Sequence, residues 1–339
     1  MARVTIAEAL REGLREEMAR DQRVFCLGED IGIRGGWGGA FTVTLGLEDQ
    51  FRDRMIDTPM SEAGFFGVAL GAAMMGLRPV VDVQYADFIY CAMDQVVNQI
   101  AKMRYMSGGK ITVPLVMRAP VGATGRGAQH GQNPEALFLS VPGLKIACPA
   151  TAYDAKGMLK AAIRDDNPVL LFEHKLLYGA KGARAESGTV DASSELPEDD
   201  YLVPLGRGTV RREGNDVTII ATLLMMHRAL AAAERLAAEG ISAEVIDPRS
   251  LVPFDWDLVN TSVMKTTRVV VVEEGPRRGG WSAEIAATLA ESMSDYLTAP
   301  IARVASPDIP VPFSPAMEAF YRPDSDRIVA AARKLVDVL

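Results

Sequence analysis

The first half of the chain alternates apolar runs with stretches of helical spacing. The runs beginning at Val24, Arg78 and Val113 are apolar on both faces, as is typical of strands in a parallel sheet that helices cover. Between them, residues 61–76 and 86–109 carry apolar side chains at helical spacing and end in glycine. This alternation predicts βα units and therefore an α/β fold.

A second α/β series follows a stretch without periodicity. Residues 180–201 are mostly small or acidic, which predicts a linker. Beyond it, three apolar runs predict further strands, at 216–222, 242–247 and 268–274. We therefore expect an α/β protein of two domains, each with a mainly parallel sheet flanked by helices. The expected boundaries are 1–185 for the first domain, 186–205 for the linker and 206–339 for the second domain.

Charge and composition narrow the function classes. The formal net charge is -8 and no cluster of Lys and Arg occurs, which argues against nucleic-acid binding. No uncharged run is long enough to span a bilayer, so we expect a cytoplasmic protein that does not bind membranes. The three cysteines, Cys26, Cys91 and Cys148, lie far apart in apolar surroundings, which predicts buried, reduced thiols.

The loop that follows the third apolar run contains Gly125, Gly127, His130 and Gly131. Its glycines suggest a dinucleotide-binding turn, and hence a nicotinamide-dependent oxidoreductase. The spacing is G-x-G-x-x-x-G, however, the loop is too long for a tight turn, and no acidic residue follows about 20 residues later, so we reject that interpretation. An Asn-Pro pair predicts a helix that begins at Pro134. These residues leave open whether His130 is catalytic or is a loop histidine bonded to backbone.

A carboxylate stands at the start of an almost wholly apolar helix. Ser61 is expected to cap this helix and Glu62 to lie in its first turn, while the apolar remainder should be buried. The four glycines of this segment, Gly64, Gly67, Gly71 and Gly76, are tolerable only where another backbone or a ligand comes close. Glu62 therefore has two interpretations: it complements the helix dipole, or it accepts a hydrogen bond from a ring nitrogen of a bound heterocycle.

Several segments, in unbroken order from about Thr5 to Asp326, resemble one family. They include DTPMSEAGF, DQVVNQIAKMRYMSGG, QHGQNPEALF, EVIDPRSLVPFD and EEGPRRGGWSAEIA. The resemblance is to the β subunits of thiamine-diphosphate-dependent 2-oxo acid dehydrogenases, which include pyruvate, branched-chain and acetoin dehydrogenase first-enzyme components. It implies a thiamine-diphosphate-binding fold with a transketolase-like pyrimidine-binding domain, a transketolase C-terminal-like domain, and an α2β2 heterotetramer.

The resemblance also implies roles for individual residues. Glu62 matches the family glutamate that hydrogen-bonds N1′ of the aminopyrimidine, and His130 matches the histidine that orients lipoyl and handles protons during acyl transfer. Phe88 falls where relatives place an aromatic ring beside the pyrimidine, with Met60 and Gln84 nearby. Core packing remains the alternative for these last three.

A further segment matches a cation site of some relatives. Backbone carbonyls at the positions of Ala162, Asp165 and Asn167 hold a monovalent ion such as K⁺ in those proteins, although a turn before a strand would look the same.

The chain departs from the family at two places. Gly131 stands where many relatives have serine, which predicts a freer loop. Apolar residues at 223–225 precede His227, where pyruvate and branched-chain relatives carry small residues, and this favours the acetoin branch. For His227 an interface, a capping and a catalytic role all stay open.

One half of the family's active site is missing from the sequence. No Gly-Asp-Gly segment with downstream paired asparagines, the family's Mg²⁺ and diphosphate ligands, occurs here. We therefore expect an α subunit to hold Mg²⁺ and to share thiamine diphosphate with this chain, which argues against a single-chain transketolase or pyruvate decarboxylase.

The expected function is that of a β subunit whose enzyme decarboxylates a 2-oxo acid, pyruvate or branched-chain. The acyl unit then passes to lipoyllysine on a partner acyltransferase. An acetoin-cleaving dehydrogenase and a non-catalytic scaffold subunit of the same fold are the alternatives, and the presence of both Glu62 and His130 argues against the scaffold.

Overall fold

A computed structural model describes residues 3–179 and 190–337. The chain forms two compact units, Met1–Val121 with Leu137–Leu205, and Gly122–Ala136 with Gly206–Leu339. No pattern in the sequence indicated that Gly122–Ala136 would leave the first unit for the second.

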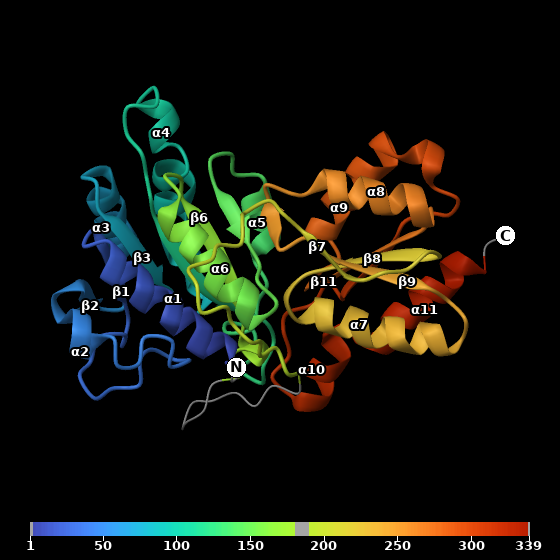
Figure 1. The fold of residues 1–339 in the computed structure, drawn as a ribbon, viewed down its shortest axis with the longest axis horizontal. Helices are drawn as coiled ribbons and strands as arrows, with labels where there is room; N and C mark the ends of the chain where they lie inside the picture. Colours follow the sequence, from blue (N-terminus) through green and yellow to red (C-terminus); the bar gives the residue numbers. More distant parts are fainter. Residues whose placement is uncertain (1–2, 180–189, 338–339) are drawn as a thin grey trace. The chain divides into compact units, whose positions relative to one another are not determined.

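The first unit is built on a parallel sheet ordered β5-β6-β4-β3-β1-β2 (Figure 1). The strands are β1 Val24–Gly28, β2 Met55–Asp57, β3 Arg78–Asp82, β4 Val116–Val121, β5 Lys145–Ala147 and β6 Val169–His174. The α-helices of this part of the chain are α1 Ile6–Arg20, α2 Glu48–Phe51, α3 Glu62–Met74, α4 Met103–Met106, α5 Glu135–Leu139 and α6 Ala152–Arg164. Shorter or tighter turns are η1 Arg52–Arg54, η2 Ala86–Ala92, η3 Gln95–Ile100 and η4 Lys175–Leu177. The parallel order confirms the predicted βα repetition.

The second unit has a sheet ordered β12-β11-β8-β9-β7, in which only the edge strand β7 runs antiparallel. The strands of this part are β7 Thr209–Arg212, β8 Val217–Ala221, β9 Ala243–Asp247, β10 Ser250–Val252, β11 Val269–Pro276 and β12 Ala302–Ser306. The helices are α7 Leu223–Ala238, α8 Trp256–Thr266, α9 Trp281–Ser292, η5 Ser294–Tyr296, α10 Pro315–Tyr321 and α11 Ser325–Val336. Helices α7 and α11 pack on one face of the sheet and α8 and α9 on the other (Figure 1).

The segment 86–109, predicted as one helix, is divided into η2, the π-helical turn η3, and α4. Ile89, Val96 and Ile100 point inward as their spacing predicted. A change between tight and wide turns shifts the register of the backbone hydrogen bonds while these side chains stay in the core.

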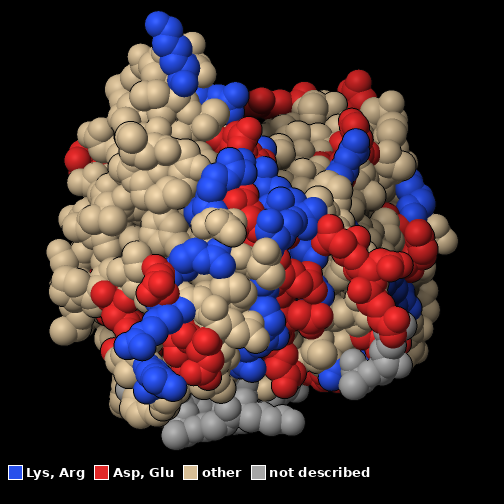
Figure 2. Space-filling view, turned by 60° about the vertical axis from the view of Figure 1, so that its left-hand side comes forward, with Lys and Arg blue, Asp and Glu red and all other residues tan. Residues whose placement is uncertain are grey.

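Helix α3 is only half buried, which corrects the prediction that it lies wholly inside. Phe66 and Ala69 are fully buried, whereas the side chains of Val68 and Met75, just past the helix end, are 60% and 85% exposed. The apolar pattern therefore reflects a second face that the described residues of this unit leave exposed. Figure 2 shows a broad area, at the left of its view, with few charged side chains.

The cysteines and the expected linker agree only in part with their predictions. Cys26 and Cys148 are buried, but Cys91 is exposed, because the turn η2 places it on the outer side. Of the expected linker, 186–189 lie outside the described residues, and 190–205 belongs to the first unit, where the Tyr201 ring stacks on Tyr153 at 4.6 Å. Among the described residues, no helix is both long and apolar enough to cross a membrane.

Candidate active site

Three strands of the first unit end together. Gly28, the last residue of β1, pairs in parallel register with Asp57 at the end of β2 and with Asp82 at the end of β3. The segments that follow these residues therefore meet at the carboxyl edge of the sheet, where open α/β sheets bind ligands.

Glu62 lies at this edge as the first residue of α3, and its side chain is half buried. Ser61 is the N-cap residue, as predicted, but its side chain makes no capping hydrogen bond. Burial, together with the negative charges of Glu62 and Asp30, raises the pKa of Glu29 above its usual value. Two carboxylates thus oppose each other electrostatically at the start of α3.

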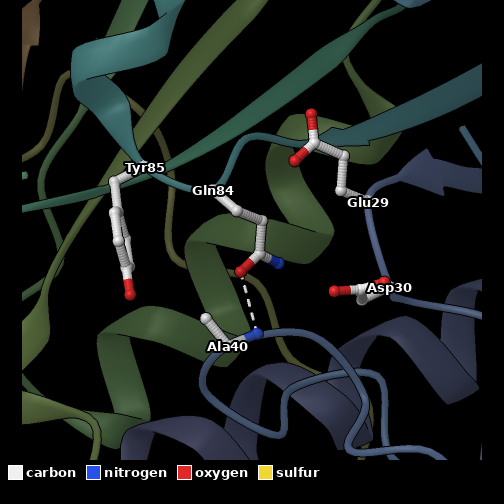
Figure 3. Close-up of a pocket in the computed structure, with 5 residues that line it drawn as sticks. All are labelled: Glu29, Asp30, Ala40, Gln84 and Tyr85. Atoms are coloured by element: carbon white, nitrogen blue, oxygen red, sulfur yellow. Dashed lines mark hydrogen bonds between the residues drawn. The ribbon is translucent and has the colours of Figure 1, made fainter. Parts of the chain in front are cut away.

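Glu29 was missed as a site residue by the sequence reasoning. The sequence did contain a signal for it, because the acidic residues Glu29 and Asp30 directly follow the buried strand β1. Glu29, Asp30, Ala40, Gln84 and Tyr85 line a cavity of about 140 Å³ (Figure 3).

Gln84 uses both ends of its amide to hold this edge together. Its Oε1 accepts the N–H of Ala40 at 2.8 Å (Figure 3). Its Nε2 donates to Asp82 Oδ1 at 2.9 Å. Asp82 Oδ2 in turn accepts Arg118 Nη1 at 2.6 Å. The buried Arg118 also bonds Glu173 in bidentate fashion, at 2.8 and 2.7 Å. This fully buried network fixes the orientation of Gln84.

Met60 and Phe88 flank the same edge on two segments. Met60 is 87% exposed, so core packing is wrong for it. Phe88 lies half buried on η2, which follows Gln84 and packs against α3. Met60, exposed two residues before Glu62, and the half-exposed aromatic ring on η2 leave apolar surface for a ligand or another chain to cover.

His130 belongs to the second unit, on an irregular loop between β4 and α5. Helix α5 begins at Glu135, one residue later than predicted, and is short. Gly125 and Gly127 adopt positive φ angles of 76° and 79°, which favour glycine, and the loop is not the tight turn of a dinucleotide site. The imidazole of His130 is half buried.

The freer loop expected from Gly131 is wrong. Gly131 is buried, and a Cβ at this position would lie 2.9 Å from Val311 Cγ1 and 3.2 Å from the Gly127 carbonyl oxygen. The small residue here permits close packing within the second unit.

The segment expected to hold a monovalent cation already meets a cationic side chain. Arg78 Nη1 donates to the carbonyl oxygens of Ile163 and Asp165 at 2.8 and 3.0 Å. The Ala162 carbonyl accepts the Asp165 N–H, and Asn167 Oδ1 accepts Arg104 Nη1. Because this segment precedes β6 and Arg78 begins β3, it lies at the amino edge, opposite Glu62.

The two other histidines lie on α7 and at the end of β6. Leu223, Leu224 and Met225 are buried in the first turn of α7, and His227 follows them half buried. The third histidine, His174, is buried, and its Nδ1 accepts the Leu176 N–H. Among residues 3–179 and 190–337, no group of three or more His, Cys, Asp or Glu side chains could hold a metal ion.

Comparison with known proteins places both units. Residues 2–181 match the transketolase pyrimidine binding domain, and residues 206–328 match the transketolase C-terminal domain. The 2-oxoisovalerate dehydrogenase subunit beta of Bacillus subtilis is 44% identical over 99% of this chain and 100% of its own length. The β subunit of acetoin:2,6-dichlorophenolindophenol oxidoreductase from Cupriavidus necator is 46% identical over 98% of both.

A mitochondrial relative and a solved structure extend this likeness. The pyruvate dehydrogenase E1 component subunit beta of Dictyostelium discoideum is 44% identical over 98% of this chain and 91% of its own length. A solved structure described as a split-gene transketolase in an inactive β4 tetramer aligns with a TM-score of 0.79 and 27% identity, over 99% of each chain.

Proposed function

The chain belongs to the family of β subunits of 2-oxo acid and acetoin dehydrogenases, and we propose that it serves a thiamine-diphosphate-dependent enzyme that decarboxylates a 2-oxo acid. The acyl unit then passes to lipoyllysine on a partner acyltransferase. The observation that carries this proposal is Glu62 at the first position of α3, opposed by Glu29 at the carboxyl edge of the sheet.

The residues at this edge fit the pyrimidine end of thiamine diphosphate. Glu62 is a half-buried anion that can accept a hydrogen bond from a ring nitrogen, and the half-exposed ring of Phe88 offers an aromatic face. When bound, thiamine diphosphate supplies the carbon nucleophile that attacks the substrate carbonyl. Glu62 holds the ring and favours the tautomer that can accept a proton.

An α subunit is proposed to cover the outer face of α3 and to hold Mg²⁺. Gly71 has no atom within 4 Å of an added Cβ, and Gly67 has only the Gln95 side chain, at 3.9 Å. Val68 is 60% exposed between them. Small residues on an exposed apolar face allow a helix of a second chain to approach closely, which supports an α2β2 heterotetramer.

His130 is proposed to act when the acyl unit reaches lipoyl. Its imidazole is half buried on a loop rather than inside a packed helix, so a swinging lipoyl group can reach it. A neutral imidazole can both accept and donate a proton, as acyl transfer requires.

Acetoin remains the second candidate substrate. Leu223, Leu224 and Met225 form the apolar turn that favours the acetoin branch, and all three are buried. Identities of 44% to the 2-oxoisovalerate subunit and 45% to the acetoin subunit of Bacillus subtilis do not rank the two. We expect either enzyme to work in the cytoplasm.

K⁺ binding at the Ala162–Asn167 turn is also a proposal. A carbonyl oxygen has two lone pairs, so the Asp165 carbonyl can accept Arg78 and still coordinate an ion. Thermal unfolding in KCl against tetramethylammonium chloride tests this: K⁺-specific protection supports the site, and equal melting temperatures argue against it.

Calorimetric titration with thiamine diphosphate and Mg²⁺ tests the shared site. The chain alone should bind weakly, whereas the complex with its α subunit should bind tightly and reduce an artificial electron acceptor with a 2-oxo acid or acetoin. Submicromolar binding by the chain alone would contradict the shared site. A complex that binds the cofactor but turns over none of these substrates would favour the scaffold.

A further inference from the structure

The loop that carries His130 is anchored by two buried carboxylates from distant parts of the second unit. The N–H of Gly125 donates to Glu318 Oε1 at 2.6 Å, and the N–H of Ala123 donates to Glu274 Oε1 at 2.8 Å. Glu318 lies on α10 and Glu274 on β11, and both side chains are buried. Two carboxyl side chains that follow the loop by 151 and 193 residues thus each accept one of its backbone N–H groups.

The same stretch of loop is held by packing and by an arginine. Arg322 Nη1 donates to the Ala123 carbonyl at 3.1 Å, so both backbone groups of Ala123 are bound. Ala123 packs with buried Val311 and Tyr321. The backbone is therefore fixed at Ala123 and Gly125, a few residues before the histidine.

The turn at Gly127 connects these anchored residues to His130. The N–H of His130 donates to the Gly127 carbonyl at 3.3 Å, and an added Cβ on Gly127 would meet the Phe313 ring at 3.2 Å. Gly125 and Gly127, which lie between the anchors and the imidazole, both take positive φ angles, a conformation that glycine adopts without strain. A shift at Gly125 therefore displaces His130.

We propose that Glu318, assisted by Glu274, is a positioning residue for His130: it fixes the loop so that the imidazole is presented for acyl transfer. This inference rests on the proposed function. Glu318 acts through the Gly125 N–H and does not touch substrate. Losing this bond should therefore slow the step that uses His130 more than it weakens the fold.

Tryptic cleavage after Arg126 in the full chain reports the order of the loop directly, because Arg126 is exposed on it. Glu318→Ala should speed this cleavage about tenfold, the effect of losing one hydrogen bond. Glu318→Gln keeps an oxygen that can accept the Gly125 N–H and should stay near the wild-type rate. Glu244→Ala is the matched control, since this buried carboxylate of the same unit pairs with Lys265 and Ser262.

A double-mutant cycle in the complex with the α subunit separates positioning from a general loss of structure. Glu318→Ala should lower acylation of a lipoyl domain about tenfold. Turnover with an artificial acceptor should change little. When His130 is already replaced by alanine, Glu318→Ala should have almost no further effect on lipoyl acylation, because both substitutions impair the same step.

Three results would overturn the inference: unchanged cleavage after Arg126 in Glu318→Ala, an equal increase in Glu244→Ala, or the same loss of lipoyl acylation with and without His130. If Glu318→Ala does not fold, Glu318→Asp, whose shorter side chain draws the carboxyl away from the Gly125 N–H, replaces it in the same cycle, with a loss expected only where His130 is present. An inactive wild-type complex would refute the proposed function, while the cleavage rates would still decide whether Glu318 orders the loop.

Discussion

Glu62 and Glu29 carry like charges at one sheet edge. Burial, together with the negative charge of Glu62, raises the pKa of Glu29. A ring nitrogen that donates to Glu62 would offset part of that repulsion. The site is therefore poised to accept a donor rather than an anion.

Glu62→Gln should cost catalysis more than folding. The amide keeps the shape of the side chain and removes the anionic acceptor, so turnover with the α subunit should fall by roughly 10² to 10⁴. The melting temperature should shift little, because the side chain is only half buried. Asp49→Asn, on the exposed side of α2, is the control. Unchanged turnover in Glu62→Gln would remove this residue from the mechanism.

His130→Ala should divide the reaction into its two halves. Turnover with an artificial acceptor, which bypasses lipoyl, should fall modestly, whereas acylation of the lipoyl domain should fall by about 10². Equal losses in the two assays would move His130 to the first chemical step. No loss in either assay would make it a loop histidine bonded to backbone.

Glu135 makes stability depend on pH. Burial raises its pKa from 4.5 to about 7, with further contributions from Glu273 and Glu274. The folded chain therefore holds a proton that the unfolded chain releases, so the contribution of Glu135 to stability is fully present below about pH 4.5 and is lost as the pH rises to about 7. A shift of roughly 2 to 3 units corresponds to about 3 kcal/mol.

Urea unfolding at about pH 5 and about pH 8 measures this dependence. Glu135→Gln should lose less stability between the two pH values than the wild type does. Glu273, whose pKa is also raised to about 7 by burial, leaves part of the effect in place. Asp257→Asn, at an exposed position on α8, should change nothing. An unaltered pH dependence in Glu135→Gln would refute the assignment.

At the level of elements, strands were easier to predict than turns. A continuous apolar run usually forms a buried strand, and the run at β11 does so in the structure. In residues 86–109 the apolar side chains point inward as predicted, but the backbone forms three separate turns rather than one helix. Apolar spacing constrains the side-chain positions more strongly than the pattern of backbone hydrogen bonds. The apolar α3 was misjudged, since a sequence does not distinguish an apolar face that is buried in its own unit from one that stays exposed there.

Gly131 and Val311 should show coupled stabilities. Gly131→Ser places a Cβ 2.9 Å from Val311 Cγ1, and such overpacking costs about 1 to 3 kcal/mol. Val311→Ala removes that clash and leaves a small cavity. Thermal unfolding of the double variant should therefore show a smaller loss than the sum of the two single losses. Additive losses would mean that the loop yields at Gly131 instead.

For the whole molecule, the sequence indicated two α/β units but not how the chain is shared between them. Glu62 follows the end of strand β2, and the cation segment lies at the end of helix α6. The alternation of strands and helices is therefore enough to predict that the two lie at opposite edges of the sheet. Gly122–Ala136 belongs to the second unit through Glu274 and Glu318. Hydrogen bonds across 151 and 193 residues leave no periodic trace in a sequence.

Association with the α subunit should depend on the outer face of α3. Val68→Lys places a charge on an apolar face without disturbing the buried residues, because Val68 is 60% exposed. Affinity for the α subunit, measured by calorimetry, should fall about 100-fold or more, as at an interface centre. The isolated chain should melt as the wild type does. Met264→Lys, at a 46% exposed position on α8, is the control. Equal affinities of Val68→Lys and wild type would exclude this face.

The long separation between the histidine loop and its anchors also affects the order of events during synthesis. Glu318 leaves the ribosome 193 residues after Gly125. At translation rates of about 5–20 residues per second, that interval is on the order of 10 to 40 seconds. Throughout it the loop lacks Glu318, and it also lacks Glu274 until 151 residues beyond Ala123 have been made. A nascent chain that stalls before α10 would thus carry Glu62 and its sheet edge, but a His130 loop without its Glu318 anchor.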